Sequence, residues 1–182
     1  AAKGLQIGGT GSFLIAGEVG ANPALRANGS DIAMLQELVT DSSLRGLVSV
    51  FAVNVDGGSR SPYDRRANVE TSSLSRVVLI REAMDDAGAT GVPLWFTHFG
   101  WTGEGGQPVS LVQQASFVEA GMRRAREEWP WVGLIFNWTY AAIADQPETA
   151  PMALIASGNP TPLMVAMGDF SRSAIGSSIT SG

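Results

Sequence analysis

Four apolar segments of strand length recur along the chain, and stretches with helical periodicity separate them. The apolar segments are FLIAGEVG at 13–20, LVSVFAVNVDGG at 47–58, VPLWFTHFG at 92–100 and WVGLIFNW at 131–138. Valine, isoleucine and aromatic residues are frequent in them, and a glycine turn closes each of the first three. This pattern predicts four β-strands.

Three helices are expected in the intervening stretches. The first begins at Ser30, the second covers residues 74–88, and the third runs from Ser110 to about Glu128. Ser30 is a candidate N-cap, and Gly88 is placed to end the second helix. Ser110 and Gln113 have the spacing of a capping box at the start of the third helix.

The pattern weakens from Ala141 onward. We expect a short strand or hairpin within MALIASGNPTPLMVAM at 152–167, and a frayed tail from about residue 171 to 182. No linker or repeat interrupts the chain, so residues 1–182 are predicted to form a single domain.

Strands that alternate with helices predict an α/β fold with a parallel sheet and covering helices. Strands that are apolar throughout are typical of a sheet buried on both faces. Binding sites in such folds lie at the carboxyl ends of the strands. The candidate ligand-binding residues there are Glu18, Asn54, Asp56, Thr97, His98, Asn137, Trp138 and Tyr140.

The composition argues against several classes of function. Hydrophobic residues are 45% and charged residues 16%, as in globular proteins. The net charge is -5 without a dense Lys/Arg run, which argues against a nucleic-acid partner. No apolar run reaches the length of a membrane span. The absence of cysteine excludes disulfides and thiol catalysis, and no cofactor is predicted.

The motifs between Leu74 and Trp138 resemble the C-terminal part of the (β/α)8-barrel glycoside hydrolases with two catalytic glutamates, above all their cellulase-like and xylosidase-like members. VPLWFTHFGW is similar to the family's PVWITEFGW, and SRVVLIREAMDDAG resembles the helix before that seventh strand. VSLVQQASFVEAGMRRAREEWPWVGLIFNW resembles the segment through the eighth strand, and LVSVFAVNVDGG is similar to the sixth. The resemblance implies half of a TIM-type barrel, strands five to eight.

The chain departs from this family at the catalytic positions. His98 stands where the family has its nucleophilic glutamate, and the Asn-Glu pair that carries the acid/base glutamate does not occur. A retaining glycosidase needs two carboxyl groups about 5 Å apart, and an imidazole supplies no negative charge. The resemblance therefore implies a degenerate glycoside-hydrolase-like protein that is not catalytic on its own and acts in self-assembly or carbohydrate binding.

Two alternatives remain at this stage. An active glycoside hydrolase, completed by a partner chain or an oligomer, would need another carboxylate, for which Glu104 is a candidate. A metal-dependent enzyme would use Glu18, Asp56 and His98, which end three consecutive strands. The structural alternative is that His98 is a hydrogen-bonded framework residue and Glu104 a solvated surface charge.

The aromatic residues at the strand ends and the edges of the sheet suggest a ligand and a partner. Trp101 and Trp138 follow strands, where a ring either stacks on a sugar or packs the end of the barrel. Four strands of a barrel leave two edges and one apolar face uncovered, which favours a homo-oligomer or a complementary half-barrel chain. Carbohydrate is the candidate ligand. The residues do not fix a compartment, although the resemblance favours an extracellular one.

Overall fold

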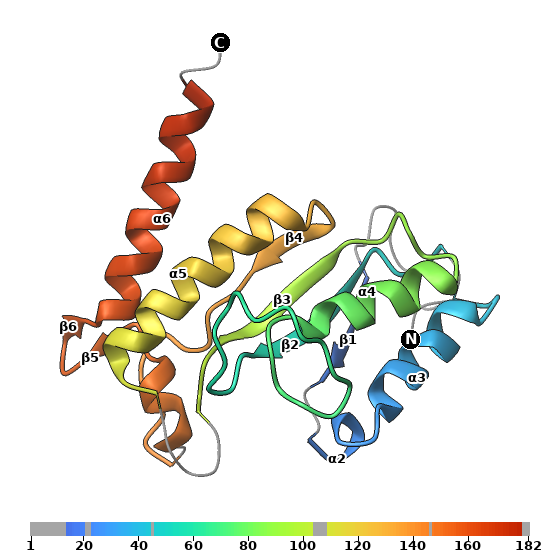
Figure 1. Cartoon of the computed structure of the whole chain (residues 1–182), viewed down its shortest axis with the longest axis horizontal. Helices are drawn as coiled ribbons and strands as arrows, with labels where there is room; N and C mark the ends of the chain where they lie inside the picture. The colour runs from blue at the N-terminus through green and yellow to red at the C-terminus, as the bar shows by residue number, and fades with distance from the viewer. Residues whose placement is uncertain (1–13, 21–22, 45, 104–108, 146, 180–182) are drawn as a thin grey trace.

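The computed structural model of the chain describes residues 14–20, 23–44, 46–103, 109–145 and 147–179. Its centre is a four-stranded parallel sheet flanked by helices, and a two-stranded hairpin and a long helix follow the sheet (Figure 1). The predicted α/β class with a parallel sheet is confirmed. Among the described residues, none of the helices is both long and apolar enough to cross a bilayer.

The sheet contains its strands in the order of the sequence, β1-β2-β3-β4. The strands are β1 (Ile15–Val19), β2 (Val50–Asp56), β3 (Leu94–Gly100) and β4 (Val132–Ile135). Each lies inside one of the four apolar segments of the sequence. The outer strands β1 and β4 each pair with one neighbour in this sheet, whereas β2 and β3 pair on both sides.

The helices between the strands begin and end largely where the sequence signals lie. They are α2 (Pro23–Arg26), α3 (Ser30–Thr40), α4 (Arg76–Asp86) and α5 (Leu111–Glu128). Ser110 caps α5, because its hydroxyl oxygen accepts the Gln113 N–H at 3.2 Å. Gly88 follows α4 with a φ of 84°, as a terminating glycine does. The prediction for Ser30 was wrong: Gly29 is the N-cap, with a φ of 73°.

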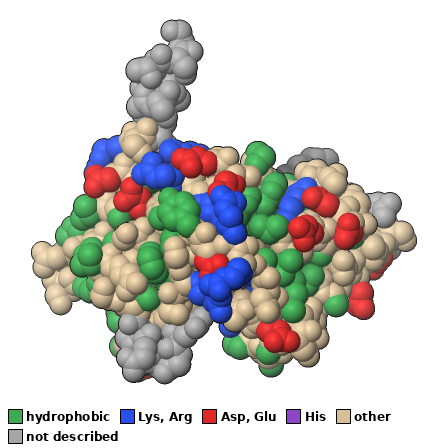
Figure 2. All heavy atoms as spheres, in the orientation of Figure 1, with side chains coloured by type: hydrophobic (Ala, Val, Ile, Leu, Met, Phe, Trp, Pro, Cys, Tyr) green, Lys and Arg blue, Asp and Glu red, His purple; other side chains and the backbone are tan. Residues whose placement is uncertain are grey.

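Helices α3, α4 and α5 cover one face of the sheet (Figure 1). Phe51, Val53, Leu94 and Phe96 of β2 and β3 belong to the core that these helices share with the sheet. Figure 2 shows this side of the molecule, where charges of both signs are interspersed with apolar side chains and the histidine is not visible.

The opposite face of the sheet is only partly buried. We call it the open face, and it carries Ile15, Trp95, Leu134 and Phe136. Ile15 is 45% exposed, Leu134 46% and Phe136 44%, and the Trp95 and Phe136 rings are 5.7 Å apart. The expected burial on both faces is therefore wrong for the outer strands, although β2 is buried along most of its length.

The C-terminal part of the chain adds a predicted hairpin and an unpredicted helix. The elements are η1 (Pro147–Met152), β5 (Ile155–Ala156), β6 (Asn159–Pro160) and α6 (Pro162–Ile179). Helix α6 includes most of the tail that was expected to fray, and residues 180–182 lie outside the described residues. Ser171 and Ser173 donate to backbone carbonyls inside α6, at 2.9 and 2.7 Å, so their hydroxyls are satisfied within the helix.

Two buried arginines connect the helices on the covered face. Arg76 of α4 donates to both oxygens of Asp31 in α3, at 2.7 and 2.9 Å, and both side chains are at most 5% exposed. Arg124 of α5 donates to the Pro62 carbonyl at 2.7 Å and to the Ser75 hydroxyl at 2.9 Å. Arg124 thereby holds the long β2–α4 loop against α5.

Replacing Arg76 by Leu should lower the free energy of unfolding by about 3–5 kcal/mol, because the Asp31 carboxylate then stays buried without its cation. Denaturant unfolding measures this loss. Arg123→Leu is the matched control, since its ion pair with Glu119 is about 40% exposed on both sides. The control should cost less than about 1 kcal/mol. Equal losses in the two variants would contradict the assignment.

Asp64 in the β2–α4 loop and Glu128 at the end of α5 have lowered pKa values. Hydrogen bonds from the Arg66 side chain and backbone hold the pKa of Asp64 well below its ordinary value of 3.8. Burial raises the pKa of Glu128, but hydrogen bonds from Arg124 and Arg65 outweigh burial and lower this pKa below 4.5 overall. A lowered pKa in the folded state stabilises the fold above the ordinary pKa, and this contribution is lost as the pH falls.

Glu128→Gln should therefore destabilise the protein more at pH 7 than at pH 3. We expect a loss of about 1–2 kcal/mol at pH 7, because the hydrogen bonds from Arg124 and Arg65 lose a charged acceptor. The measurement is denaturant unfolding at both pH values. Glu127→Gln, at an exposed neighbouring position, should show no such difference. A loss for Glu128→Gln that is the same at both pH values would refute the assignment.

Candidate functional site

Side chains from the carboxyl ends of three strands meet in what we call the strand-end cluster, formed by Glu18, Thr97, His98 and Trp138. Oε1 of Glu18 accepts a hydrogen bond from the Thr97 hydroxyl and lies 2.9 Å from Nδ1 of His98. The His98 ring is 4.3 Å from the Trp138 ring, at an interplanar angle of 44°. The structure therefore brings together four of the predicted site residues.

A bulge in β3 explains why two adjacent residues reach the same carboxylate. Side chains alternate between the faces of a regular strand, so Thr97 and His98 would point to opposite sides. Here the pairing with β2 shifts after Thr97, and His98 has a φ of 47°, in the left-handed region. The extra residue turns His98 toward Glu18 and returns Phe99 to the buried core beside Phe96.

A second bulge, in β1, places Glu18. The pairing of β1 with β2 shifts between Ala16 and Val19, and Gly17 between them has a φ of 139°. A Cβ atom at residue 17 would lie 2.5 Å from the Ala52 carbonyl oxygen. Only glycine fits this close approach of the two backbones. Gly17 therefore permits the bulge that turns Glu18 away from the direction it would have in a regular strand.

The cluster is accessible and contains one carboxyl group among its four members. The Glu18 side chain is 26% exposed and the His98 side chain 32%. A carboxylate only accepts hydrogen bonds, so a neutral His98 must carry its proton on Nδ1 and leave Nε2 as an acceptor. The cluster therefore offers hydrogen-bond acceptors beside an aromatic ring.

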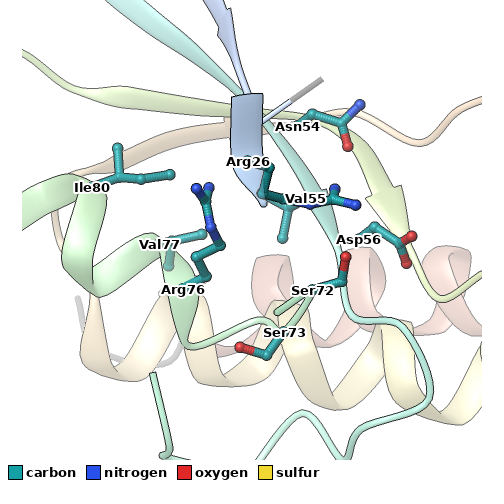
Figure 3. A pocket seen from close by; sticks show the side chains of 9 residues that line it. All are labelled: Arg26, Asn54, Val55, Asp56, Ser72, Ser73, Arg76, Val77 and Ile80. Atoms are coloured by element: carbon teal, nitrogen blue, oxygen red, sulfur yellow. The ribbon is translucent and has the colours of Figure 1, made fainter. Parts of the chain in front are cut away.

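The polar residues at the end of β2 do not join this cluster. Asp56 accepts from the Gly58 N–H at 2.9 Å and from the Thr102 hydroxyl at 2.7 Å, and so fixes the loops after β2 and β3. Asn54 and Asp56 line a small cavity of about 10 Å³ and extend away from Arg76, as Figure 3 shows. This volume corresponds to about one water molecule.

The proposed metal triad is consequently not assembled. Glu18 and His98 are in contact, but Asp56 is engaged elsewhere by Gly58 and Thr102. Within the described parts of the chain, no group of three or more metal-binding side chains is placed to hold an ion. Glu104, the candidate replacement carboxylate, lies outside the described residues.

Asn137 and Tyr140 lie on the segment that leads from β4 to the hairpin. Asn137 donates through Nδ2 to the Met152 carbonyl at 3.0 Å, while its buried Oδ1 has no hydrogen-bond partner among the described residues. Tyr140 is 70% exposed, and its backbone carbonyl accepts a hydrogen bond from the Ile155 N–H at 2.9 Å. The hairpin therefore supports the backbone next to Trp138, which is 39% exposed.

Trp101 is a correction to the predicted ligand-binding set. Its side chain is fully buried, and its indole N–H donates to the Arg60 carbonyl at 2.7 Å. Phe99 and Phe117 contact its ring edge-on. The ring fills the space above Gly57, where a Cβ would lie 2.0 Å from the indole nitrogen. Trp101 closes the core and presents no face to a ligand.

Comparison with protein-family models, with curated proteins and with solved structures gives no significant match for this chain. The function of the strand-end cluster is therefore inferred from its own geometry and from the motifs of the sequence.

The Glu18–His98 contact makes a direct prediction for nuclear magnetic resonance. His98 is the only histidine of the chain, so its imidazole ¹⁵N signals are unambiguous. Under conditions where the ring is neutral, the wild type should show the Nδ1–H tautomer. Glu18→Ala should lose this preference, and Glu18→Gln should keep it, because the amide oxygen still accepts a hydrogen bond. A tautomer unaffected by Glu18→Ala would show that the contact does not form.

Proposed function

We propose that this chain is a half barrel of the glycoside-hydrolase type that binds carbohydrate at the strand-end cluster without cleaving it. The observation that carries the proposal is the arrangement of His98 at the end of β3, where its ring contacts both the Glu18 carboxylate and the Trp138 ring. In the family that the sequence resembles, the nucleophilic carboxylate occupies this position.

The sheet topology supports the half-barrel part of the proposal. In a (β/α)8 barrel, consecutive strands are neighbours and all helices lie outside. In a doubly wound sheet the strand order reverses once and helices cover both faces. The order β1-β2-β3-β4, with α3, α4 and α5 on one face, agrees with the barrel and contains no reversal.

The chemistry of the cluster supports binding over cleavage. Retaining and inverting glycosidases both require a pair of carboxyl groups on either side of the bond. Glu18 is the one carboxylate of the cluster, and its Oε1 is engaged by Thr97 and His98. An imidazole at the nucleophile position, neutral or protonated, does not stabilise the positive charge that develops on the sugar.

The same groups are suited to hold a sugar. Trp138 and Tyr140 are 39% and 70% exposed, so parts of both rings are available to pack against the apolar face of a pyranose. Glu18 and His98 supply acceptors for sugar hydroxyls. An aromatic surface with a few convergent polar groups is typical of small-molecule sites.

Isothermal titration calorimetry with cello-oligosaccharides and xylo-oligosaccharides tests the proposal. We expect the wild type to bind at least one of these series. Trp138→Ala should raise Kd about tenfold, or about 1.4 kcal/mol, because the ring surface is lost. Val112→Ala is the control, since Val112 is 71% exposed on α5. The absence of binding in the wild type, or an equal effect of the two substitutions, would refute the proposal.

An aryl glycoside tests the non-catalytic part separately. We expect no release of the aryl group. Steady release that is lost in Glu104→Gln would instead support the active hydrolase that the sequence left as an alternative.

A further inference from the structure

We infer that the saccharide bound at the strand-end cluster carries a free amino group, so that the ligand is an amino sugar in its protonated, ammonium form. The inference rests on the proposed function and names the chemical class of the ligand. It follows from the hydrogen-bonding groups of the cluster that are already paired, from those that remain, and from the aromatic ring beside them.

The hydrogen-bond donors at the cluster are used inside the protein. The Thr97 hydroxyl donates to Oε1 of Glu18. In the neutral His98 ring, the Nδ1–H is directed to the same oxygen, at 2.9 Å. The Asn137 amide beside the cluster donates through Nδ2 to two backbone carbonyls, of which that of Met152 is the nearer at 3.0 Å. Each of these donors therefore has an acceptor within the protein.

Two acceptors of the cluster remain for a ligand. Oε1 of Glu18 takes the hydrogen bonds from Thr97 and His98, and Oε2 of the same group has no hydrogen-bond partner among the described residues. Nε2 of His98 is an acceptor whenever Nδ1 holds the proton. An ammonium group has three N–H donors and no acceptor, whereas a sugar hydroxyl has one donor and two acceptor lone pairs. The remaining groups of the cluster therefore match an ammonium group better than a hydroxyl.

An aromatic ring lies directly beside these acceptors. The Trp138 ring contacts the His98 ring, with 4.3 Å between the ring centroids, and Trp138 is 39% exposed. Cations are attracted to the faces of aromatic rings, and most strongly to the face of tryptophan. A carboxylate and an indole ring that contact the same imidazole are close enough to act on one ligand. Both groups favour a cationic sugar, whereas a carboxylate repels an acidic one.

The described arginines have their partners outside the cluster. Arg26 donates to the Gly20 carbonyl at 3.3 Å, and Arg126 lies over the Phe170 ring. The others form ion pairs with aspartate or glutamate side chains away from Glu18, namely Arg60, Arg65, Arg66, Arg76, Arg81, Arg123, Arg124 and Arg172. Within the described part of the chain, the one side chain able to carry positive charge that contacts Glu18 is His98. An ammonium group of the ligand would supply the missing counter-charge.

Isothermal titration calorimetry with three trisaccharides tests the inference. The β-1,4-linked trimers of glucosamine, of N-acetylglucosamine and of glucose differ only in the group on carbon 2. At a pH that keeps the amine protonated, we expect the glucosamine trimer to bind with a Kd about tenfold below those of the other two. Equal Kd values for the three sugars, or tighter binding of a neutral one, would overturn the inference.

A pair of matched variants separates the cluster from the net charge of the protein, which by itself attracts cations. Glu18→Gln keeps an oxygen that accepts from His98 but removes the carboxylate, so the preference for the glucosamine trimer should be lost. Glu127→Gln changes the net charge by the same amount at an exposed position on α5, and should keep the preference. Thermal unfolding checks that both variants are folded. Equal effects of the two substitutions would overturn the inference.

Nuclear magnetic resonance of the wild type gives a second readout that needs no variant. The chain has a single histidine, so its two imidazole ¹⁵N signals are assigned without ambiguity. The glucosamine trimer should shift the Nε2 signal more than the Nδ1 signal, because Nε2 accepts from the ligand. An Nε2 signal that does not move when the trimer is saturating would overturn the inference.

The neutral sugars and a simple amine separate this inference from the proposed function. If the glucose and glucosamine trimers bind equally well, the amino-sugar inference fails and the proposed function stands. If none of the three trimers binds, both fail. Ethylammonium chloride tests the contribution of the sugar. Binding of this ion as tight as that of the glucosamine trimer would overturn the assignment of a saccharide.

Discussion

The arrangement of the molecule depends on one constraint of chain geometry. When consecutive parallel strands are neighbours and every crossover has the same hand, all the connecting helices fall on one face of the sheet. The order β1-β2-β3-β4 imposes this on α3, α4 and α5. One face then holds the core and its buried Arg76–Asp31 ion pair, and the other keeps apolar residues that no described helix covers. The covered face therefore holds the core of the fold, and the open face keeps large apolar side chains exposed.

The strand-end cluster arises from two interruptions of this regular sheet. A strand without bulges would direct neighbouring residues to opposite faces, and Thr97 and His98 would not share a partner. The shifts in β1 and β3 occur near the carboxyl ends, so they change the direction of Glu18 and His98 without disturbing the paired core below. Irregular backbone of this kind is typical of places where a protein positions functional groups.

Local signals in the sequence predicted the local structure well. The strands, the Ser110 cap and the terminating Gly88 depend on neighbouring residues, and the structure confirms them. Features that depend on distant residues were harder to predict. Trp101 follows a strand in the sequence, but Arg60 and Phe117 bury it. The Glu18–His98 contact joins residues 80 positions apart and requires both bulges. Gly17, in the bulge of β1, is the only residue that indicates either bulge in the sequence. Helix α6 was missed because serine and glycine have low helix propensity.

Gly17 places an unusual restriction on how this protein can change. The two backbones approach so closely there that a single added carbon atom would collide with the Ala52 carbonyl. Relief of that collision would push β1 away from β2 and carry Glu18 with it. The imidazole would lose its carboxylate although neither residue had been altered. Selection for the Glu18–His98 pair would therefore act on a position that has no side chain, and a survey of variants confined to polar residues would overlook it.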